Sequence, residues 1–436
     1  MESNKETIAD DLYEILTEDG EQRVCKDISD ESCREAPGNY FLNAFNGFSS
    51  KLAVQLASPT LVIPWVYSLI GVPHFFSGLL VPIKNAGSLL PQLFVSGKIR
   101  KFKKRKYFWS GAALVQALSM LLIALTIHIG DETVFGWIVV AALALFSIAS
   151  GVASIAFKDV MGKTIPKGKR GQLLALRATG GGVLTTITGV IFYFFLSNTK
   201  DESVYIWIFG VASALWVIAA VLFSLIDEEA GATEGGRTPV EELRNGLSIL
   251  KKDINYRRFL ITRGLLLSIP LVQPFFILYA QEKIGVSITG LGLFVILTGV
   301  SNMVSSPFWG KFADKSSKKL MMITGVIGAV VCGYSLIFEL LPEKWQNIYT
   351  YSPVFILIII TYGGARMARK TYLVDYAPKD ERPLYISMAN TSIGVLILLS
   401  GGLSLVVSYF GIEIMVASMA VLMLLASLNA WRLKDL

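Results

Sequence analysis

Charge is scarce in this sequence. Only 17% of the 436 residues are charged and 53% are hydrophobic, whereas an average soluble protein carries about 25% charged residues. The hydrophobic residues gather into stretches of about 20, the length that a helix needs to cross a bilayer core of roughly 30 Å. The composition therefore excludes an ordinary soluble protein and predicts an all-α integral membrane protein.

Cysteine and histidine are also scarce, with three cysteines and two histidines in the chain. Cys25 and Cys33 have no histidine nearby and make a poor zinc site, so we expect free thiols and no metal. The glycine run at 180–182 lies within an expected helix and follows no strand, so it is not a phosphate loop. No nucleophile–base pair is recognisable. We therefore expect no catalytic residues, no cofactor and no enzyme activity.

The hydrophobic stretches predict twelve membrane helices, and these divide the chain into four parts. The helices are expected at about 41–68, 72–96, 107–129, 134–157, 173–197, 204–226, 257–281, 288–309, 319–341, 352–370, 384–409 and 412–432. The four parts are an acidic N-terminal tail over 1–40, a six-helix half over 41–226, a linker over 227–256 and a second six-helix half over 257–436. The tail and the linker are each expected to contain a short amphipathic helix.

Lysine and arginine are concentrated in the loops on one side of the expected bundle. Those loops are 97–106, 158–172, 227–256, 310–318 and 371–383. Basic loops stay in the cytoplasm, so both termini are expected there. Short loops fit a bacterial inner membrane, and residues 1–37 lack the apolar run of a signal peptide. Without a basic soluble face we expect no nucleic-acid partner; we expect a monomer whose partners are the lipid bilayer and a small-molecule substrate.

Two basic segments recur at one spacing. Residues 97–106 (GKIRKFKKRK) are matched by 310–319 (GKFADKSSKK), and 166–170 (PKGKR) by 378–382 (PKDER). A duplicated six-helix unit with the pattern G-x-x-x-D-[RK]-x-x-[RK]-[RK] resembles the major facilitator superfamily (MFS). The resemblance covers about residues 40–433 and implies the MFS fold and transport by alternating access.

In that family the patterned loop braces one half against the other in the outward-facing state. The resemblance therefore implies a bracing role for the second copy of the pattern: Gly310, Asp314, Lys315, Lys318 and Lys319. The first copy departs from the pattern, because Lys101 stands where the aspartate is expected. A G-P pair typical of proton-driven drug exporters is also missing from the fifth helix, which makes that kind of antiport less favoured.

Charged and amide side chains inside the apolar segments are the candidate substrate ligands, because they are costly in a bilayer and tend to face a cavity. Lys84 lies about midway along the second helix beside Asn85 and Gly87, and is predicted to line the central cavity. Lys51, Arg177, Arg263 and Arg366 lie nearer the cytoplasmic ends and could instead extend to the interface. The full set of candidate substrate-binding residues is Lys51, Gln55, Lys84, Asn85, Ser88, Arg177, Gln273, Asn302 and Asn390.

Carboxylates are absent from the middle of the expected membrane helices. Asp159, Asp314 and Asp375 lie at cytoplasmic ends, and Glu282, Glu339 and Glu413 at outer ends. The cavity is therefore expected to be positive and to favour an anionic or amphipathic solute. Any coupling to protons would involve Asp159 or the substrate itself. With the residues of the bracing loop, Asp159, Arg263 and Arg366 are the candidate coupling or gating residues.

Prolines recur at corresponding positions of the two halves. Pro59 and Pro64 lie in the first helix, and Pro270 and Pro274 in the seventh. Proline removes a helical hydrogen bond, and paired broken helices indicate the binding site of a transporter with internal repeats. We therefore expect both helices to break here.

The leading hypothesis is a secondary active or facilitative transporter. Two alternatives stay open: a non-transporting receptor or assembly factor on the same fold that uses its acidic tail, and a lipid or lysolipid mover. The pattern leaves open the substrate, the direction of transport and the coupling ion.

Overall fold

The structure is a computed structural model, and it describes residues 12–15, 28–89, 102–166, 169–195, 203–230, 247–285, 288–378 and 382–435. Within these residues the regular secondary structure is helical. Eight helices are long and apolar enough to cross a membrane, and two shorter apolar helices accompany them. The chain thus has the all-α, multi-pass membrane fold that the sequence predicts.

Among the described residues of the first half, seven helices follow the short helix α2 (Asp30–Arg34). They are α3 (Ala36–Leu56), α4 (Val62–Ile70), α5 (His74–Leu89), α7 (Lys106–Thr126), α8 (Glu132–Thr164), α9 (Arg170–Phe195) and α10 (Ser203–Ser224). The second half contains α12 (Ile254–Leu265), α13 (Ser268–Ile284), α14 (Ile288–Ile337), α15 (Ile348–Tyr376), α16 (Arg382–Ser400) and α17 (Ser404–Trp431). Short 3-10 turns follow α14 and α16.

Two of these helices each join two predicted membrane segments. Ser316 has extended backbone angles inside α14 and separates the segments predicted at 288–309 and 319–341. Gly411, with φ +86°, lies inside α17 and ends the segment predicted at 384–409. A positive φ suits glycine because it has no Cβ.

The first and seventh predicted helices are interrupted, as their prolines indicate. The first is divided into α3 and α4 around Pro59, and the seventh into α12 and α13 at residues 266–267. Pro64 and Pro270 each occupy the third residue of the second segment, where the backbone N–H groups have no helical partner to lose. Pro274 lies inside α13. Both helices are therefore interrupted, the first around Pro59 and the seventh just before Pro270 and not at its prolines.

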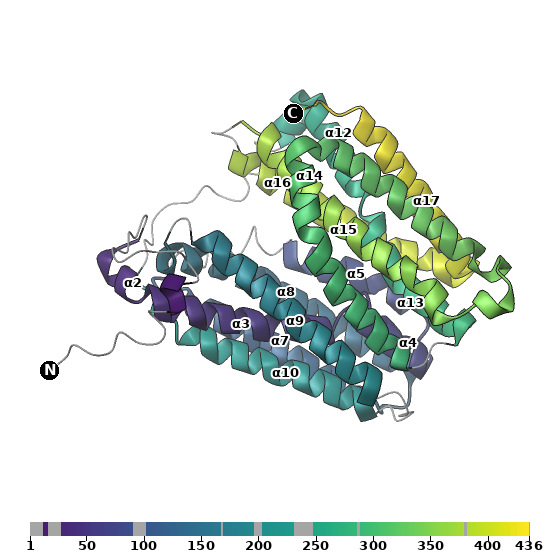
Figure 1. The fold of residues 1–436 in the computed structure, drawn as a ribbon, viewed down its shortest axis with the longest axis horizontal. Helices are drawn as coiled ribbons and strands as arrows, with labels where there is room; N and C mark the ends of the chain where they lie inside the picture. Colours follow the sequence, from purple (N-terminus) through teal and green to yellow (C-terminus); the bar gives the residue numbers. More distant parts are fainter. Residues whose placement is uncertain are drawn as a thin grey trace.

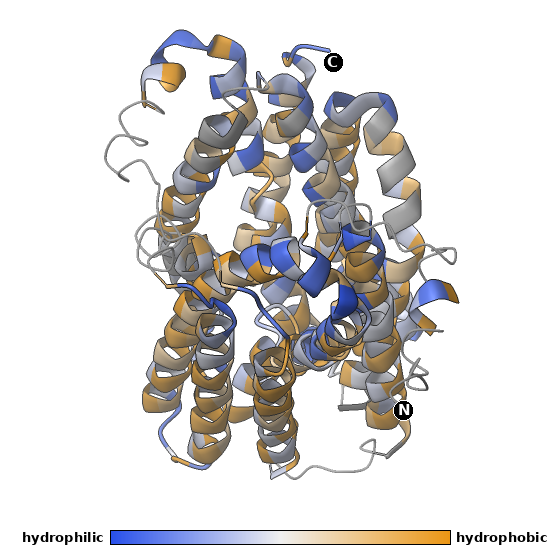
Figure 2. Ribbon diagram, turned by 90° about the vertical axis from the view of Figure 1, so that its left-hand side faces the viewer, coloured by the Kyte–Doolittle hydropathy of each residue, from blue (hydrophilic) through white to orange (hydrophobic). Residues whose placement is uncertain are grey.

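The two halves diverge from one shared end (Figure 1). They meet where α4, α13 and the start of α5 lie, which we call the closed side. They separate toward the side where α3 begins and α17 ends, which we call the open side. Viewed toward the open side, hydrophobic residues cover most of the outer helices, and hydrophilic residues gather near the middle of the view and at helix ends (Figure 2).

The acidic tail contacts the open side of the first half. A helical turn at 12–15 buries Tyr13 among Tyr40, Ile165 and Leu173, with the Tyr13 and Tyr40 rings edge to face at 5.2 Å. The spacing of Ile8, Leu12, Ile15 and Leu16 predicts that they form the apolar face of the amphipathic helix expected in the tail. Leu12 and Ile15 are exposed, and Ile8 and Leu16 lie outside the described residues. Cys33 is disulfide-bonded, so our expectation of a free thiol there was wrong.

Closely packed glycines join the halves along α9 and α14. A Cβ on Gly292 would overlap the backbone nitrogen of Tyr193, and one on Gly189 would lie 2.8 Å from the backbone nitrogen of Ile296. Small residues allow membrane helices to approach this closely. The two halves are thus in backbone contact along one pair of helices.

Replacing Gly292 with alanine should weaken this interface. We expect Gly292→Ala to cost about 1–3 kcal/mol of stability, as overpacking does, and to lower the melting temperature in detergent. Gly333→Ala is the matched control, because it lies on the same helix and a Cβ there meets no atom within 4 Å. Equal melting temperatures for the two variants would contradict this account of the interface.

Candidate functional site

Two cations of the first half pack reciprocally between α3 and α9. Gly47 of α3 lies against the Arg177 side chain of α9, and Gly181 of α9 lies against Lys51 of α3, where an added Cβ would be 2.6 Å from the Lys51 Cβ. Gly47 and Lys51 are four residues apart and so share one face of α3, as Arg177 and Gly181 share one face of α9. Each glycine makes room for the cation of the opposite helix.

Arg177 is buried inside the first half, with 7% of its surface exposed. Its Nη1 donates to the backbone and side-chain oxygens of Asn43, and to Asn46 Oδ1 at 3.1 Å. The guanidinium lies over the Phe157 ring, 4.5 Å from its centroid, a favourable cation–π contact. Arg177 therefore does not extend to the membrane interface, whereas Lys51 is exposed.

Further cations come from the second half. Arg263 of α12 is buried, and its Nη2 donates to Asn390 Oδ1 of α16 at 3.0 Å. On α15, Arg366 lies 5.9 Å from the centroid of the Tyr362 ring, and Lys370 is exposed one turn further on. The predicted residues Arg263, Arg366 and Asn390 are thus placed on three helices of the second half.

These cations repel one another across the boundary between the halves. Lys51 is repelled by Arg177 of its own half and by Arg366 and Lys370 of the other. Lys370 is also repelled by Lys158 at the open end of α8. Within the described residues, no ion pair with a carboxylate is formed by any of them.

A recess of about 300 Å³ opens beside Lys51 and Arg177. Its lining comes from α3, α7, α8, α9 and α10, and comprises Ser50, Lys51, Val54, Trp109, Gln116, Ser150, Ala153, Ser154, Phe157, Arg177 and Trp216. The volume is at the lower end of the range for ligand pockets, and apolar walls with a few polar groups are typical of them. The arrangement can hold an anionic group at its mouth.

Lys84 lies in drier surroundings than its sequence neighbours suggest. It lines a void with no room for a water molecule, formed with Val54, Ala57, Pro59, Met120, Leu143 and Phe146. Gly87, which had indicated a wet surface, is packed so closely on Ser147 that an added Cβ would be 2.7 Å from its Cβ. Lys84 does feel the charge of Lys51. A direct contact between Lys84 and substrate stays a prediction.

The remaining predicted ligands are dispersed. Gln55, Asn85, Ser88 and Gln273 are half-buried, and Asn302 is exposed. The Ser88 hydroxyl donates to the Asn85 carbonyl at 2.9 Å, and the Asn302 amide donates to the Thr298 carbonyl at 2.9 Å, both within their own helix. The structure does not gather these residues around Lys51 and Arg177 in the recess.

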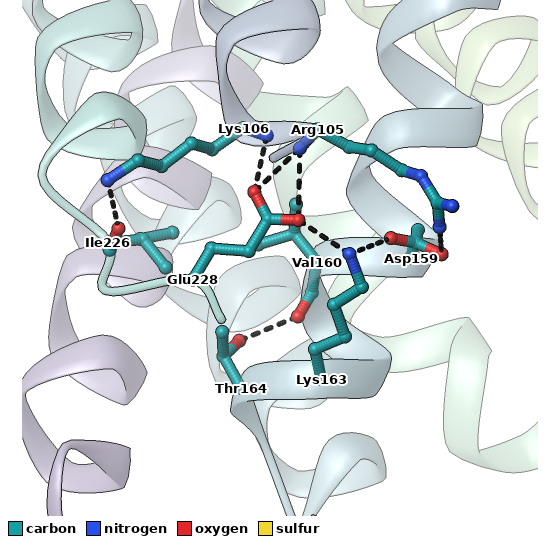
Figure 3. Close-up of polar contacts among 8 residues, drawn as sticks. All are labelled: Arg105, Lys106, Asp159, Val160, Lys163, Thr164, Ile226 and Glu228. Carbon is teal, nitrogen blue, oxygen red and sulfur yellow. Dashed lines mark hydrogen bonds and ion pairs between the residues drawn. The ribbon is translucent and has the colours of Figure 1, made fainter. Parts of the chain in front are cut away.

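A buried carboxylate organises the open side of the first half (Figure 3). Glu228, which follows α10, is fully enclosed. It accepts from the backbone N–H groups of Arg105 and Lys106, at 2.8 and 2.7 Å, and from Lys163 Nζ at 2.8 Å. The first two donors belong to the start of α7, where a carboxylate is favoured by the helix dipole.

The neighbours of Glu228 extend the network. Asp159 of α8 pairs with Arg105 and, at 2.8 Å, with Lys163, while Lys106 Nζ donates to the Ile226 carbonyl at 2.7 Å. Sequence reasoning selected Asp159 but missed Glu228. Its only sequence signal is an acid just after a membrane helix on the side rich in bases.

The predicted bracing loop is described only in part. The side chains of Gly310 and Asp314 lie outside the described residues. Lys318 pairs with Asp435 at 3.2 Å within the second half. The backbone N–H of Lys319 donates to Ser316 Oγ at 3.2 Å, and Lys315 is exposed. The contact of Lys318 with Asp435, which follows α17, places this part of the loop on the open side.

Polar contacts between the halves are found at the closed side. His74 of α5 and Glu282 of α13 approach to 2.6 Å, and the Gln281 amide donates to the Trp65 carbonyl at 3.4 Å. The hydroxyls of Tyr193 and Tyr349 are 3.5 Å apart. Beside them Lys283 holds Glu339 and Glu413 at 2.9 and 3.2 Å. These contacts can act as a gate, because each is exposed or partly exposed and breakable.

Both the sequence and the fold of this chain match those of known proteins. A family model described as Major Facilitator Superfamily matches residues 41–280 and 259–435. An uncharacterized protein of Mycobacterium tuberculosis is 24% identical over 409 residues, covering 91% of this chain and 78% of that protein. A Staphyloferrin B transporter of Staphylococcus aureus is 25% identical over 137 residues, 31% of each chain.

A solved structure of a POT family transporter in complex with 5-aminolevulinic acid has a similar fold. It superposes with a TM-score of 0.70 at 10% identity, covering 89% of this chain and 94% of that one.

Neutralising Glu228 should destabilise the first half. We expect Glu228→Gln to cost about 3 kcal/mol, because a buried cation and two N–H groups lose their charged acceptor. The neighbouring Asp227 side chain is exposed, so Asp227→Asn should change stability by less than about 0.5 kcal/mol. Melting temperatures in detergent measure both. A Glu228→Gln protein as stable as the control would show that the network contributes little.

Proposed function

This chain belongs to the Major Facilitator Superfamily, and from that premise we propose that it carries an anionic solute across the cytoplasmic membrane by alternating access. The fold and the relatives support membrane transport as such. The anionic nature of the substrate is the proposed part. It rests on Lys51, Arg177, Arg366 and Lys370 of the two halves, which form no ion pair with a carboxylate within the residues that the structure describes.

The charge distribution is the observation that carries this proposal. Lys51 interacts with cations of its own half and of the opposite half, at the mouth of a recess large enough for a small organic molecule. A cationic solute would be repelled there, and a neutral one would leave the repulsion uncompensated. An anion lowers the electrostatic energy of the cations around it.

Lys51 and Arg177 hold the solute in this proposal. Arg177 is fixed by Asn43 and Asn46, so its guanidinium is oriented before the solute arrives, and the exposed Lys51 ammonium completes the contact. Gln55, Lys84, Asn85, Ser88, Gln273, Asn302 and Asn390 are then secondary contributors to the site or to its field.

Alternating access assigns the open side to the cytoplasm, in keeping with the basic loops on that side. The present arrangement then corresponds to an inward-open state, with His74 and Glu282 closing the outer side. Asp159 acts on the open side as part of the network around Glu228. When the halves rock, the contact between His74 and Glu282 breaks and the outer side opens.

Removing the charge of Lys51 should weaken anion binding. We expect Lys51→Gln to raise the Kd for stabilising anions about tenfold, since a hydrogen bond to a charged group contributes about 1.5–3 kcal/mol. Thermal-shift titration of the full chain in detergent measures this. Lys344→Gln is the control, because Lys344 is exposed at the closed side beside Trp345. Unchanged anion binding in Lys51→Gln would refute the proposed site.

Locking the closed side should block transport while sparing binding. In a chain without its native cysteines, His74→Cys with Glu282→Cys should form a disulfide across the gate. Oxidation should abolish uptake into proteoliposomes and reduction should restore it, while anion-induced thermal shifts persist in both states. Uptake that continues after complete cross-linking would show that the gate does not open during transport.

A further inference from the structure

The recess of the first half is elongated along the helix axes. Trp109 and Gln116 are seven residues apart on α7 and both line it, as do Phe157 and Ser150 on α8. Seven residues are about two helical turns, so the recess extends over about 10 Å. Because α7 begins at the open side, Trp109 lies nearer that side, and we call the level of Gln116 the deep end. A solute with more than a single charged group is needed to fill this length.

Arg177 offers the recess further hydrogen-bond donors. Its Nη1 donates to Asn43 and Asn46, whereas its Nε and Nη2 form no hydrogen bond with the residues that the structure describes. The guanidinium is held against the Phe157 ring, which also lines the recess. With the exposed ammonium of Lys51 beside it, this fixed group can accept a carboxylate.

Two buried polar groups at the deep end have no partner among the described residues. Gln116 of α7 is 1% exposed, and its amide forms no hydrogen bond there. The indole Nε1 of Trp216 on α10, which is 4% exposed, forms none either. The two helices are in contact at this level, because the Ser213 hydroxyl donates to the Ala117 carbonyl at 2.9 Å. Buried polar groups are nearly always paired in native proteins, so this acceptor and this donor indicate a polar group of a ligand.

Aromatic rings line the recess between its two ends. Trp109, Phe157 and Trp216 come from three different helices. Trp109 stacks on Phe223 with the ring centroids 4.3 Å apart, and Trp216 contacts the Phe146 ring edge to face at 5.6 Å. These contacts fix both indoles before any solute arrives. Because rings pack favourably on other rings, such walls favour a flat aromatic body over an aliphatic chain.

We propose that the solute is an aromatic carboxylate with a hydroxyl group at the opposite end of its ring. The carboxylate binds Lys51 and Arg177, the ring lies between the aromatic side chains, and the hydroxyl reaches the deep end. A hydroxyl suits that place, because it can donate to Gln116 Oε1 and accept from Trp216 Nε1. This inference rests on the proposed anion transport and names the class of the anion.

Matched pairs of small anions test the ring and the hydroxyl separately. Benzoate and cyclohexanecarboxylate carry the same charge and differ in the ring. Benzoate and 4-hydroxybenzoate differ in the hydroxyl, and cinnamate and 4-hydroxycinnamate repeat that comparison in a longer molecule. Calorimetric titration of the full chain in detergent at pH 7 measures each Kd. We expect benzoate to bind more tightly than cyclohexanecarboxylate, and the hydroxyl to lower the Kd about fivefold in at least one pair, as one hydrogen bond does.

Two variants locate the hydroxyl at the deep end. Gln116→Leu removes the amide with little change in volume, and should abolish the preference for the hydroxylated anion while benzoate still binds. Trp216→Phe keeps a ring without the N–H and should reduce the same preference. The ratio of two Kd values on one protein is unaffected by a general loss of stability. Ligand-free Gln116→Leu should melt no lower than the native protein, since it loses a buried polar group without a partner.

Ser119→Ala is the matched control on the same helix. Ser119 is buried like Gln116, but its hydroxyl donates to the Val115 carbonyl of its own helix at 2.9 Å, and it does not line the recess. The preference for the hydroxylated anion should therefore be the same in Ser119→Ala as in the native protein.

The outcomes separate this inference from the proposed function. A hydroxyl preference that is absent from both native pairs, or that persists in Gln116→Leu and Trp216→Phe, would overturn the inference. Tighter binding of cyclohexanecarboxylate than of benzoate would overturn it as well. If Lys51→Gln still weakened the binding of these anions, anion transport would stand. The neutral 4-hydroxybenzamide binding as tightly as 4-hydroxybenzoate would overturn the proposed function and leave the contacts of the ring and hydroxyl standing.

Discussion

Like charges held close together inside a membrane protein are the constraint on which the rest of this structure depends. Like charges repel more strongly in a protein interior than in water, and the charge of Lys51 is disfavoured by Arg177, Arg366 and Lys370. The fold lowers this cost in several ways. Arg177 is contacted by amide oxygens and an aromatic ring face, Arg263 donates to Asn390, and Lys51 and Lys370 are exposed. Substrate supplies the missing negative charge in the function proposed here.

The acidic side chains with ion pairs described above lie at the two ends of the molecule. Glu228 and Asp159 neutralise bases on the open side, and Glu282, Glu339 and Glu413 gather around His74 and Lys283 on the closed side. Any of them at mid-height would pair with Lys51 or Arg366 and cancel the attraction for an anion. The separation of signs along the molecular axis therefore serves binding, while the pairs at the ends serve stability and gating.

The sequence predicted the structure best where hydrophobic periodicity and composition determine it. The helices and the interruptions of the first and seventh of them follow from the residues of one chain segment. It predicted less well the surroundings of a side chain when these come from other segments of the chain. Lys84 has polar sequence neighbours, yet its surroundings come from α3, α7 and α8 and are apolar. Glu228 is unremarkable in the sequence because its importance comes from Arg105 and Lys163, which no local pattern connects to it.

The arrangement of contacts also limits which movement the chain can make. In each half, the start of the third predicted membrane helix contacts an acidic residue that follows the last one. In the first half, the backbone N–H groups of Arg105 and Lys106 donate to Glu228. In the second half, the Lys318 side chain pairs with Asp435. These ties hold the open ends of a half together and do not cross to the other half. Polar contacts that do cross are exposed or partly exposed pairs on the closed side, such as His74 with Glu282, and exposed pairs contribute little, about 0–1 kcal/mol each. The link through Glu228 is buried, whereas the polar links between the halves are exposed or partly exposed and weak. Relative motion of the two halves therefore breaks fewer buried polar contacts than deforming the first half would, and the closely packed glycines of α9 and α14 are where the two halves stay in contact.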